Sequence, residues 1–443
     1  MRIWLTVFVI PLLLITTIGA VPAAADSKLG LNVDGAILID ADSGKILYEE
    51  NADTPLGIAS MTKMMTEYLL FEAIEAGQVT WEQEYKVTDY TYAISQDGRL
   101  SNVPLRADGT YTIKELYEAL AIYSANAATI AIAETIAGTE TAFLKLMDEK
   151  AEELGLEGFK FVNSTGLNNK DLQGMHPEGT GAEDENVMTA KSVAKLATRL
   201  LHDFPEVLET TKINSKLFRE GTSDETKMDN WNFMLPGFVY EYEGVDGLKT
   251  GTTDFAGHCF TGTAERSGNR LIAVVMNAVD AKGVGSYKAR FDATRALFDY
   301  GFSQFTEVEL LPAGYEFKEQ KTIPINKGKS DTVKVVLKEP IRMVIKKSEQ
   351  ELYKPTIVLD ESKLKDGKLD APVKKDTVVG HVEFVKTEGT DYGYIDENQL
   401  VGEVVLTESV EKAGWFSLTL RAIGAFFVGI WDAATGFVKG LFS

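Results

Sequence analysis

The chain has 443 residues, of which 44% are hydrophobic and 25% are charged, and its formal net charge is −21 at pH 7. This length indicates two or three domains, and the composition is typical of a globular protein with a sizeable core. The acidic balance leaves no basic surface to neutralise phosphates, so no nucleic-acid partner is expected.

Residues 1–25 have the pattern of a signal peptide. Arg2 supplies a positive charge, the segment 3–18 is almost continuously apolar, and Ala23-Ala24-Ala25 fits a small-residue cleavage site. We therefore expect the mature chain to begin at Asp26, with an uncleaved N-terminal anchor as the alternative. A cleaved signal peptide and an uncleaved anchor both imply that the chain is exported.

The segment 26–305 predicts an α/β catalytic domain. A hairpin is expected over 33–49 and three further strands over 245–252, 258–266 and 270–278. Helices are expected over 60–76, over 113–154 with a break at Ser124 and a stop at Gly138, over 189–201 and over 287–300. These elements predict an antiparallel sheet flanked by helices, with an all-helical insertion between its strands.

Residues 306–410 predict a small all-β domain. The β-branched runs 332–337, 341–345, 356–359, 377–385 and 401–406 are separated by Lys, Asp and Gly. They carry no obvious chemistry, so a spacer or docking role is favoured over a second active site.

The tail 411–443 predicts an amphipathic helix that lies on a membrane surface. One helical face holds apolar residues, Trp415 and Trp431 are typical of an interface, and the longest uncharged run, 422–431, is shorter than the ~20 residues of a span. A helix packed on the β domain is the alternative.

Ser60-Met61-Thr62-Lys63 forms an S-x-x-K pattern at the start of a predicted helix. A spacing of three places Ser60 and Lys63 on one face, where a neutral lysine can serve as base for the weakly nucleophilic hydroxyl. The pattern alone is weak, because it recurs at Ser192, Ser362 and Ser409. The first of these lies inside a helix without a partner motif, and the other two lie outside the catalytic domain.

Two later motifs distinguish Ser60 from these repeats. Ser124-Ala125-Asn126 lies at a break between apolar helices, and Lys249-Thr250-Gly251 lies on a predicted strand. The order S-x-x-K, S-x-N, K-T-G is closely related to the series of β-lactamases and penicillin-binding proteins. Four histidines and the single Cys259 form no ligand cluster, so neither a metal nor another cofactor is expected.

Each further residue of the series has a chemical use. Ser124 can relay a proton to the leaving amine, Asn126 can hold the substrate amide, and Lys249 can keep Lys63 neutral. Gly251 lets an extended substrate approach the strand, and Thr252 offers a hydroxyl to a substrate carboxylate. The backbone N–H groups of Ser60 and Thr252 would form the oxyanion hole.

With these motifs the sequence resembles the D-alanyl-D-alanine carboxypeptidases, low-molecular-mass penicillin-binding proteins of Gram-positive type. Further stretches that carry the resemblance are 58–66, 122–128, 161–167 and 245–252. The resemblance implies a penicillin-binding/β-lactamase-like catalytic fold and a serine acyl-enzyme mechanism, without a cofactor. Catalysis would use Ser60, Lys63 and Ser124, and substrate would be bound by Asn126, Lys249, Thr250, Gly251 and Thr252.

The implied partners are peptidoglycan pentapeptide stems, which lose their terminal D-alanine so that cross-linking is limited, and β-lactam antibiotics. The implied location is the outer face of the bacterial cytoplasmic membrane, with the tail from 413 to 443 as a peripheral anchor. A β-lactamase-like hydrolase and a non-catalytic penicillin-binding wall scaffold are the alternative functions. Some family members carry His after the K-T-G glycine, where this chain has Thr252.

Overall fold

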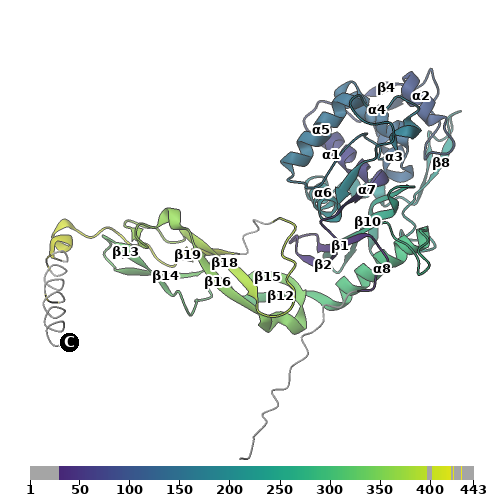
Figure 1. Cartoon of the computed structure of the whole chain (residues 1–443). Helices are drawn as coiled ribbons and strands as arrows, with labels where there is room; N and C mark the ends of the chain where they lie inside the picture. The colour runs from purple at the N-terminus through teal and green to yellow at the C-terminus, as the bar shows by residue number, and fades with distance from the viewer. Residues whose placement is uncertain (1–28, 397–401, 421–422, 424–430, 432–443) are drawn as a thin grey trace, which may run out of the picture.

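The computed structural model describes residues 29–396, 402–420, 423 and 431. Figure 1 shows a rounded N-terminal domain and an elongated β domain that extends away from it. The predicted signal peptide and most of the predicted tail helix lie outside the described residues. Where the tail is described, it lies at the far tip of the β domain (Figure 1).

A five-stranded antiparallel sheet forms the centre of the N-terminal domain, in the order β2-β1-β11-β10-β9. Its strands are β1 (Gly35–Asp40), β2 (Ile46–Glu50), β9 (Val245–Thr253), β10 (Gly257–Arg266) and β11 (Asn269–Met276). They confirm the predicted hairpin and the three predicted later strands. Because β9 is an edge strand, one of its sides remains free for other groups.

Helices cover both faces of this sheet. Helix α8 (Tyr287–Gln304) packs on one face, and α1 (Lys63–Glu75) and α6 (Ala190–Asp203) lie on the side of the other. Every residue of β1 is buried, as expected for a strand covered on both faces. This arrangement confirms the predicted antiparallel sheet flanked by helices.

The insertion between β2 and β9 contains more than the predicted helices. The predicted run 113–154 is three helices, α3 (Ile113–Tyr123), α4 (Asn126–Ala137) and α5 (Glu140–Glu153), which are interrupted at Ser124 and near Gly138. The short elements that the sequence did not indicate are α2 (Asp89–Ser95), α7 (Val207–Thr211) and the strand pairs β3 (Pro55–Gly57) with β6 (Val187–Thr189), β4 (Glu84–Lys86) with β5 (Thr110–Thr112), and β7 (Ser215–Phe218) with β8 (Thr226–Asp229).

The C-terminal domain is all-β, as predicted. Its predicted strands are β14 (Thr332–Leu337), β15 (Ile341–Lys346), β16 (Tyr353–Leu359), β18 (Val378–Lys386) and β19 (Glu403–Leu406), and the additional ones are β12 (Phe305–Leu311), β13 (Thr322–Asn326) and β17 (Leu369–Asp370). Strand β12 follows α8 directly and pairs with β15, so the connection between the two domains is short. No helix among the described residues is long and apolar enough to cross a membrane.

A loop of the β domain, residues 387–396, returns to the N-terminal domain. The backbone N–H of Ile46 donates to the carbonyl of Gly393 at 3.0 Å. The buried Lys45 forms an ion pair with Asp391 and lies 4.7 Å from the centre of the Tyr394 ring. Backbone, ionic and cation–π contacts therefore join the two domains at a second place.

Candidate active site

Ser60 lies in a short 3-10 helix, η1 (Ala59–Thr62), that leads directly into α1. The sequence placed Ser60 at the start of an α-helix, whereas the α-helical part begins at Lys63. In a 3-10 helix the side chains at positions i and i+3 eclipse each other, which brings Ser60 and Lys63 together. The preceding Ala59 is buried with a φ of 45°, a strained conformation for alanine that the surrounding contacts maintain.

The Lys63 amine has three close oxygen neighbours. Its Nζ lies 3.0 Å from Ser60 Oγ, 2.8 Å from Asn126 Oδ1 and 2.7 Å from the Thr165 carbonyl oxygen. Two of these oxygens can only accept hydrogen bonds, and the third belongs to a hydroxyl that can also donate. A neutral amine has two N–H donors and one lone pair, so it satisfies both carbonyl oxygens and presents its lone pair to the Ser60 hydroxyl.

The surroundings of Lys63 favour this neutral form. Its side chain is completely buried, and this burial lowers the pKa of Lys63 well below its ordinary value. The positive charge of Lys249 lowers the pKa further, while the carboxylates of Glu67 and Glu140 act in the opposite direction. Lys63 is therefore suited to accept a proton near neutral pH.

The S-x-N motif lies at the junction of α3 and α4. The Asn126 Nδ2 donates to the Ser101 carbonyl at 3.0 Å, which fixes Oδ1 toward Lys63. Its amide is thus occupied by the protein rather than open to a substrate. Ser124, the left-handed C-cap of α3, is buried, and its hydroxyl makes no hydrogen bond to another described residue. Within this motif, Lys63 Nζ contacts Asn126.

The K-T-G motif lies on the edge strand β9, next to the nucleophile. A Cβ on Gly251 would lie 2.6 Å from the Ile58 carbonyl oxygen and 3.1 Å from Ser60 N, so only glycine permits this approach. Lys249 is buried, and its Nζ donates to the Thr250 carbonyl at 3.1 Å. The backbone N–H groups of Ser60 and of the strand therefore lie in one small region.

Arg290 lies on α8, which covers one face of the sheet, and it forms hydrogen bonds with this strand. Its Nη1 donates to the Gly251 carbonyl and to Thr252 Oγ1, both at 3.1 Å, and to the Cys259 carbonyl at 3.0 Å. The sequence analysis missed Arg290, because an arginine in an amphipathic helix carries no distinguishing signal.

The loop 161–167 contributes two contacts that sequence reasoning did not assign. The Thr165 carbonyl accepts from Lys63, and Gly166 packs against Ala59. Gly166 has a φ of 83°, and a Cβ there would lie 1.8 Å from the Ala59 carbonyl oxygen. A backbone carbonyl has no side-chain signature, although the Asn163-to-Leu167 stretch was part of the family resemblance.

Replacing Gly166 by alanine is expected to lower both stability and acylation. The new methyl group would displace the backbone of Ala59, which immediately precedes Ser60, and cost about 1–3 kcal/mol or more. Thermal unfolding and the rate of labelling by penicillin measure the two effects. Gly174→Ala is the matched control, because Gly174 has a φ of 81° but open space at its Cβ. Equal effects of the two variants would contradict this assignment.

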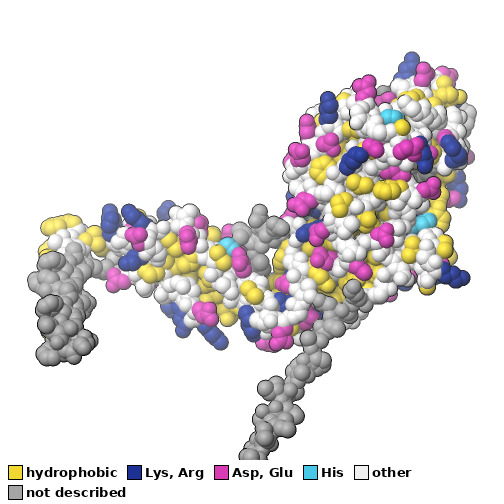
Figure 2. Space-filling view, viewed as in Figure 1, with side chains coloured by type: hydrophobic (Ala, Val, Ile, Leu, Met, Phe, Trp, Pro, Cys, Tyr) yellow, Lys and Arg dark blue, Asp and Glu magenta, His cyan; other side chains and the backbone are white. Residues whose placement is uncertain are grey.

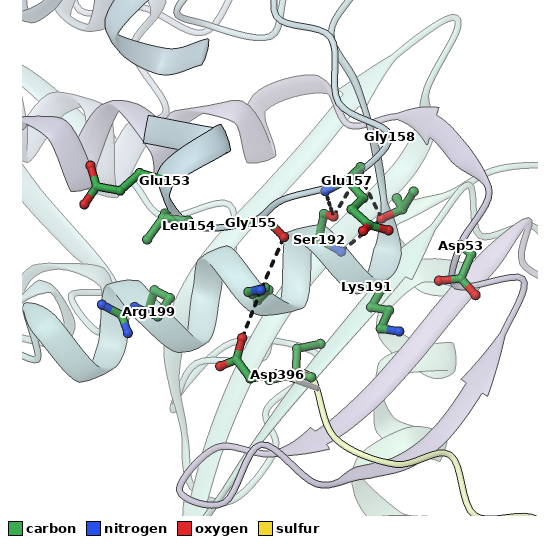
Figure 3. A pocket seen from close by; sticks show the side chains of 13 residues that line it. Asp53, Glu153, Leu154, Gly155, Glu157, Gly158, Lys191, Ser192, Arg199 and Asp396 are labelled. Carbon is green, nitrogen blue, oxygen red and sulfur yellow. Dashed lines mark hydrogen bonds and ion pairs between the residues drawn. The ribbon is translucent and has the colours of Figure 1, made fainter. Parts of the chain in front are cut away.

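The repeated S-x-x-K pattern in α6 has no such arrangement. Ser192 Oγ donates to the Glu157 carbonyl at 2.8 Å, whereas Lys195 contacts Asp396 at 2.9 Å and the Gly155 carbonyl at 3.2 Å. These residues line an open cavity of about 650 Å³. Figure 3 shows Ser192 directed toward Glu157 at this cavity. The lysines distinguish the two patterns: Lys63 is fully buried and contacts Ser60, whereas Lys195 is partly exposed and contacts other groups.

The described part of the chain holds no group of three or more His, Cys, Asp or Glu side chains that could bind a metal ion. Cys259 is buried in β10, where its thiol donates to the Ala256 carbonyl at 3.2 Å. The groups that the structure brings together near Ser60 are the Lys63 amine, the Asn126 amide and backbone atoms of β9 and of the loop 161–167.

Comparison with known proteins agrees with this geometry. The family model of the D-alanyl-D-alanine carboxypeptidases (peptidase family S11) matches residues 22–280, and that of the penicillin-binding protein 5 C-terminal domain matches residues 305–412. The chain is 31% identical to the D-alanyl-D-alanine carboxypeptidase DacF of Bacillus subtilis over 90% of its own length and 91% of that protein's.

Two solved structures are similar as well. PBP3 of Streptococcus pneumoniae, described as a peptidoglycan synthesis regulatory factor, superposes with a TM-score of 0.70 at 36% identity, over 86% of this chain and all of that one. Penicillin-binding protein D2 of Listeria monocytogenes, in its ampicillin-bound form, superposes with a TM-score of 0.51 at 32% identity, over 62% of this chain and all of that one.

Proposed function

The chain belongs to the D-alanyl-D-alanine carboxypeptidase family of serine peptidases, and we propose that Ser60 carries that family's reaction here. The substrate is the D-Ala–D-Ala terminus of a peptidoglycan pentapeptide stem, and β-lactams acylate the same centre. We assign the catalytic unit to residues 26–305 and the supporting β domain to 306–410.

In the first step Ser60 Oγ attacks the carbonyl carbon of the D-Ala–D-Ala bond, and its proton passes to Lys63 Nζ. The backbone N–H groups of Ser60 and Thr252 stabilise the resulting oxyanion. When the C–N bond breaks, the proton moves through Ser124 to the leaving nitrogen, and D-alanine departs. Water then hydrolyses the Ser60 ester and releases the tetrapeptide.

Substrate binding is assigned to Asn126 and to the edge strand. The extended peptide lies along β9, where Gly251 allows close approach and Lys249 and Thr250 border the cleft. Thr252 offers its hydroxyl to the terminal carboxylate, supported by Arg290, which already donates to that oxygen. Asn126 holds Lys63 in the structure, so its contact with the substrate amide requires its side chain to exchange partners.

One observation carries the proposal. Lys63 Nζ lies 3.0 Å from Ser60 Oγ, and its two other neighbours are acceptor-only oxygens. The direct test is D-alanine release from a D-Ala–D-Ala peptide, with the same peptide ending in L-alanine as the control. Release from the first peptide alone is expected. Efficient opening of penicillin without D-alanine release would favour a β-lactamase, and stable acylation without release would favour a scaffold.

We further propose that the protein is exported and held at the outer face of the cytoplasmic membrane by its tail. Two described tail residues support this: Trp415 is 78% exposed and Trp431 is 70% exposed. Figure 2 shows hydrophobic side chains at the tip of the β domain, where the grey atoms of the tail begin. Exposed aromatic residues of this kind are typical of a membrane-surface helix.

Deleting residues 413–443 is expected to release the enzyme from membranes and leave its turnover unchanged. The reason is that the described start of the tail, residues 413–420, lies at the tip of the β domain that is far from the N-terminal domain (Figure 1). In cells expressing the full chain, the mature protein should begin at Asp26 and sediment with membranes. A truncated protein that still sediments with lipid, or a full-length protein that stays in the supernatant, would contradict the proposed anchor.

A further inference from the structure

Glu67 is a buried acid beside the two lysines of the active site. It follows Lys63 by four residues on α1, so both side chains project from the same side of the helix. Only 1% of Glu67 is exposed. A carboxylate buried this completely costs several kcal/mol unless other charges or hydrogen bonds compensate it.

Hydrogen bonds do not provide that compensation. Glu67 Oε1 is fully buried without a hydrogen-bond partner among the described residues. The second buried acid of the region, Glu140 of α5, differs: its Oε1 accepts from the Ser164 N–H at 2.8 Å and from the Ser164 hydroxyl at 2.6 Å, and its Oε2 accepts from Tyr90 at 2.8 Å. The carboxylate of Glu140 is therefore stabilised by hydrogen bonds, mostly from the loop 161–167. Within the described part of the chain, the carboxylate of Glu67 can be stabilised only by the charges of its neighbours.

The charges that act on Glu67 are those of the catalytic lysines. Burial raises the pKa of Glu67, and the positive charges of Lys249 and Lys63 lower it. Burial likewise lowers the pKa of Lys249, with Glu67 raising it and Arg290 of α8 lowering it further. Tyr117 of α3 is the other titratable neighbour, and burial, together with the charge of Glu67, raises the pKa of this phenol well above its ordinary value.

The numbers of positive and negative groups differ here: two buried amines, those of Lys63 and Lys249, lie near the one carboxylate of Glu67. One negative charge compensates one ammonium. The mechanism requires a neutral Lys63, which a charged Lys249 favours. One charged and one neutral amine is also the distribution that a single carboxylate supports. We propose that Glu67 is a positioning residue whose carboxylate keeps Lys249 charged while Lys63 remains the uncharged base. This inference rests on the roles assigned to the two lysines under the proposed function.

The proposal predicts a shift of the whole pH profile. Removing a negative charge disfavours both ammonium forms, so the pKa values of Lys249 and Lys63 both fall. The acid limb of the acylation rate, set by deprotonation of Lys63, and the alkaline limb, set by loss of the Lys249 charge, both move to lower pH. For Glu67→Gln we expect a shift of the alkaline limb by about one pH unit or more.

The experiment measures acylation by a fluorescent penicillin from pH 5 to pH 10 for the full-length wild type and four variants. Glu67→Gln and Glu67→Met, two independent charge-free replacements, are expected to show the same shift and to lose about tenfold or more of the rate on the alkaline side. Glu67→Asp keeps the charge and is expected to keep both limbs. Glu72→Gln removes a partly exposed acid from the same helix, where it pairs with Lys150, and is expected to change neither limb.

Two results would overturn the role of Glu67: both limbs of the pH profile stay in place, or the rate falls equally at every pH. Either result in a charge-free variant that folds would contradict the proposal, because a merely structural residue has those effects. A wild type that shows no acylation at any pH would instead refute the proposed function itself. The two failures are therefore distinguishable in one set of measurements.

Discussion

Ser60→Ala is expected to abolish both D-alanine release and covalent labelling by penicillin. The substitution removes the hydroxyl oxygen that we propose forms the acyl ester, and it leaves the backbone N–H groups of the proposed oxyanion hole in place. Loss of a catalytic serine lowers turnover by ~10³-fold or more, with the remainder carried by the oxyanion hole and by binding. The measurements are D-alanine release from a D-Ala–D-Ala peptide and stoichiometric acylation, both compared with the wild type.

The chain supplies a matched control for this result. Ser192→Ala removes the serine of a second S-x-x-K pattern whose hydroxyl is bonded to the Glu157 carbonyl instead of a lysine. This variant is expected to retain full labelling, with a small loss of stability from the missing hydrogen bond. Equal D-alanine release by wild type and Ser60→Ala would remove Ser60 from the mechanism.

Lys63→Met is expected to have the next largest effect. Methionine has nearly the length of lysine but cannot accept the Ser60 proton, and it leaves the carbonyl oxygens of Asn126 and Thr165 without a donor. Loss of general-base catalysis accounts for ~10²–10⁴-fold in the acylation rate. Rapid-mixing kinetics with penicillin measure this rate directly, and thermal unfolding reports the cost of the two unpaired oxygens.

A second substitution tests whether Lys63 acts as a proton acceptor or as a positive charge. Lys63→Arg keeps a positive charge and hydrogen-bond donors, but a guanidinium does not give up its proton at neutral pH. It is therefore expected to be as slow as Lys63→Met. Recovery by arginine to near the wild-type rate would contradict the neutral-base assignment, and so would a wild-type rate in Lys63→Met. Lys195→Met, in the second S-x-x-K pattern, serves as the control.

The regular elements of the fold were predictable because their apolar patterns are long. The strands β9 to β11 and the helices α3 to α6 were expected within a few residues of where they lie. The three-residue strands such as β4 and β5 were not, since three residues are too few to show a period of two. Strand β12 was not predicted because it follows α8 directly. Strand β13 was not predicted because it is short and lies between charged residues.

The motif residues were predictable as a set, and their surroundings were not. Lys63 contacts both Ser60 and Asn126, whose motifs were expected to belong to one site. The Thr165 carbonyl carries no sequence signal, because every residue has one. Glu67 was also invisible, since a glutamate at position i+4 of a lysine usually marks an exposed helix face. The helices α4, α5 and α6 pack around α1, on which Glu67 is buried.

Mapping the penicillin adduct tests the central claim most directly. Trypsin cleavage after Lys45 and Lys63 yields a peptide, 46–63, in which Ser60 is the only serine. Full-length protein labelled with penicillin is expected to carry the penicilloyl group on that peptide and on the Ser60 oxygen. An adduct on Ser124, on Ser192 or on any other residue would contradict the account.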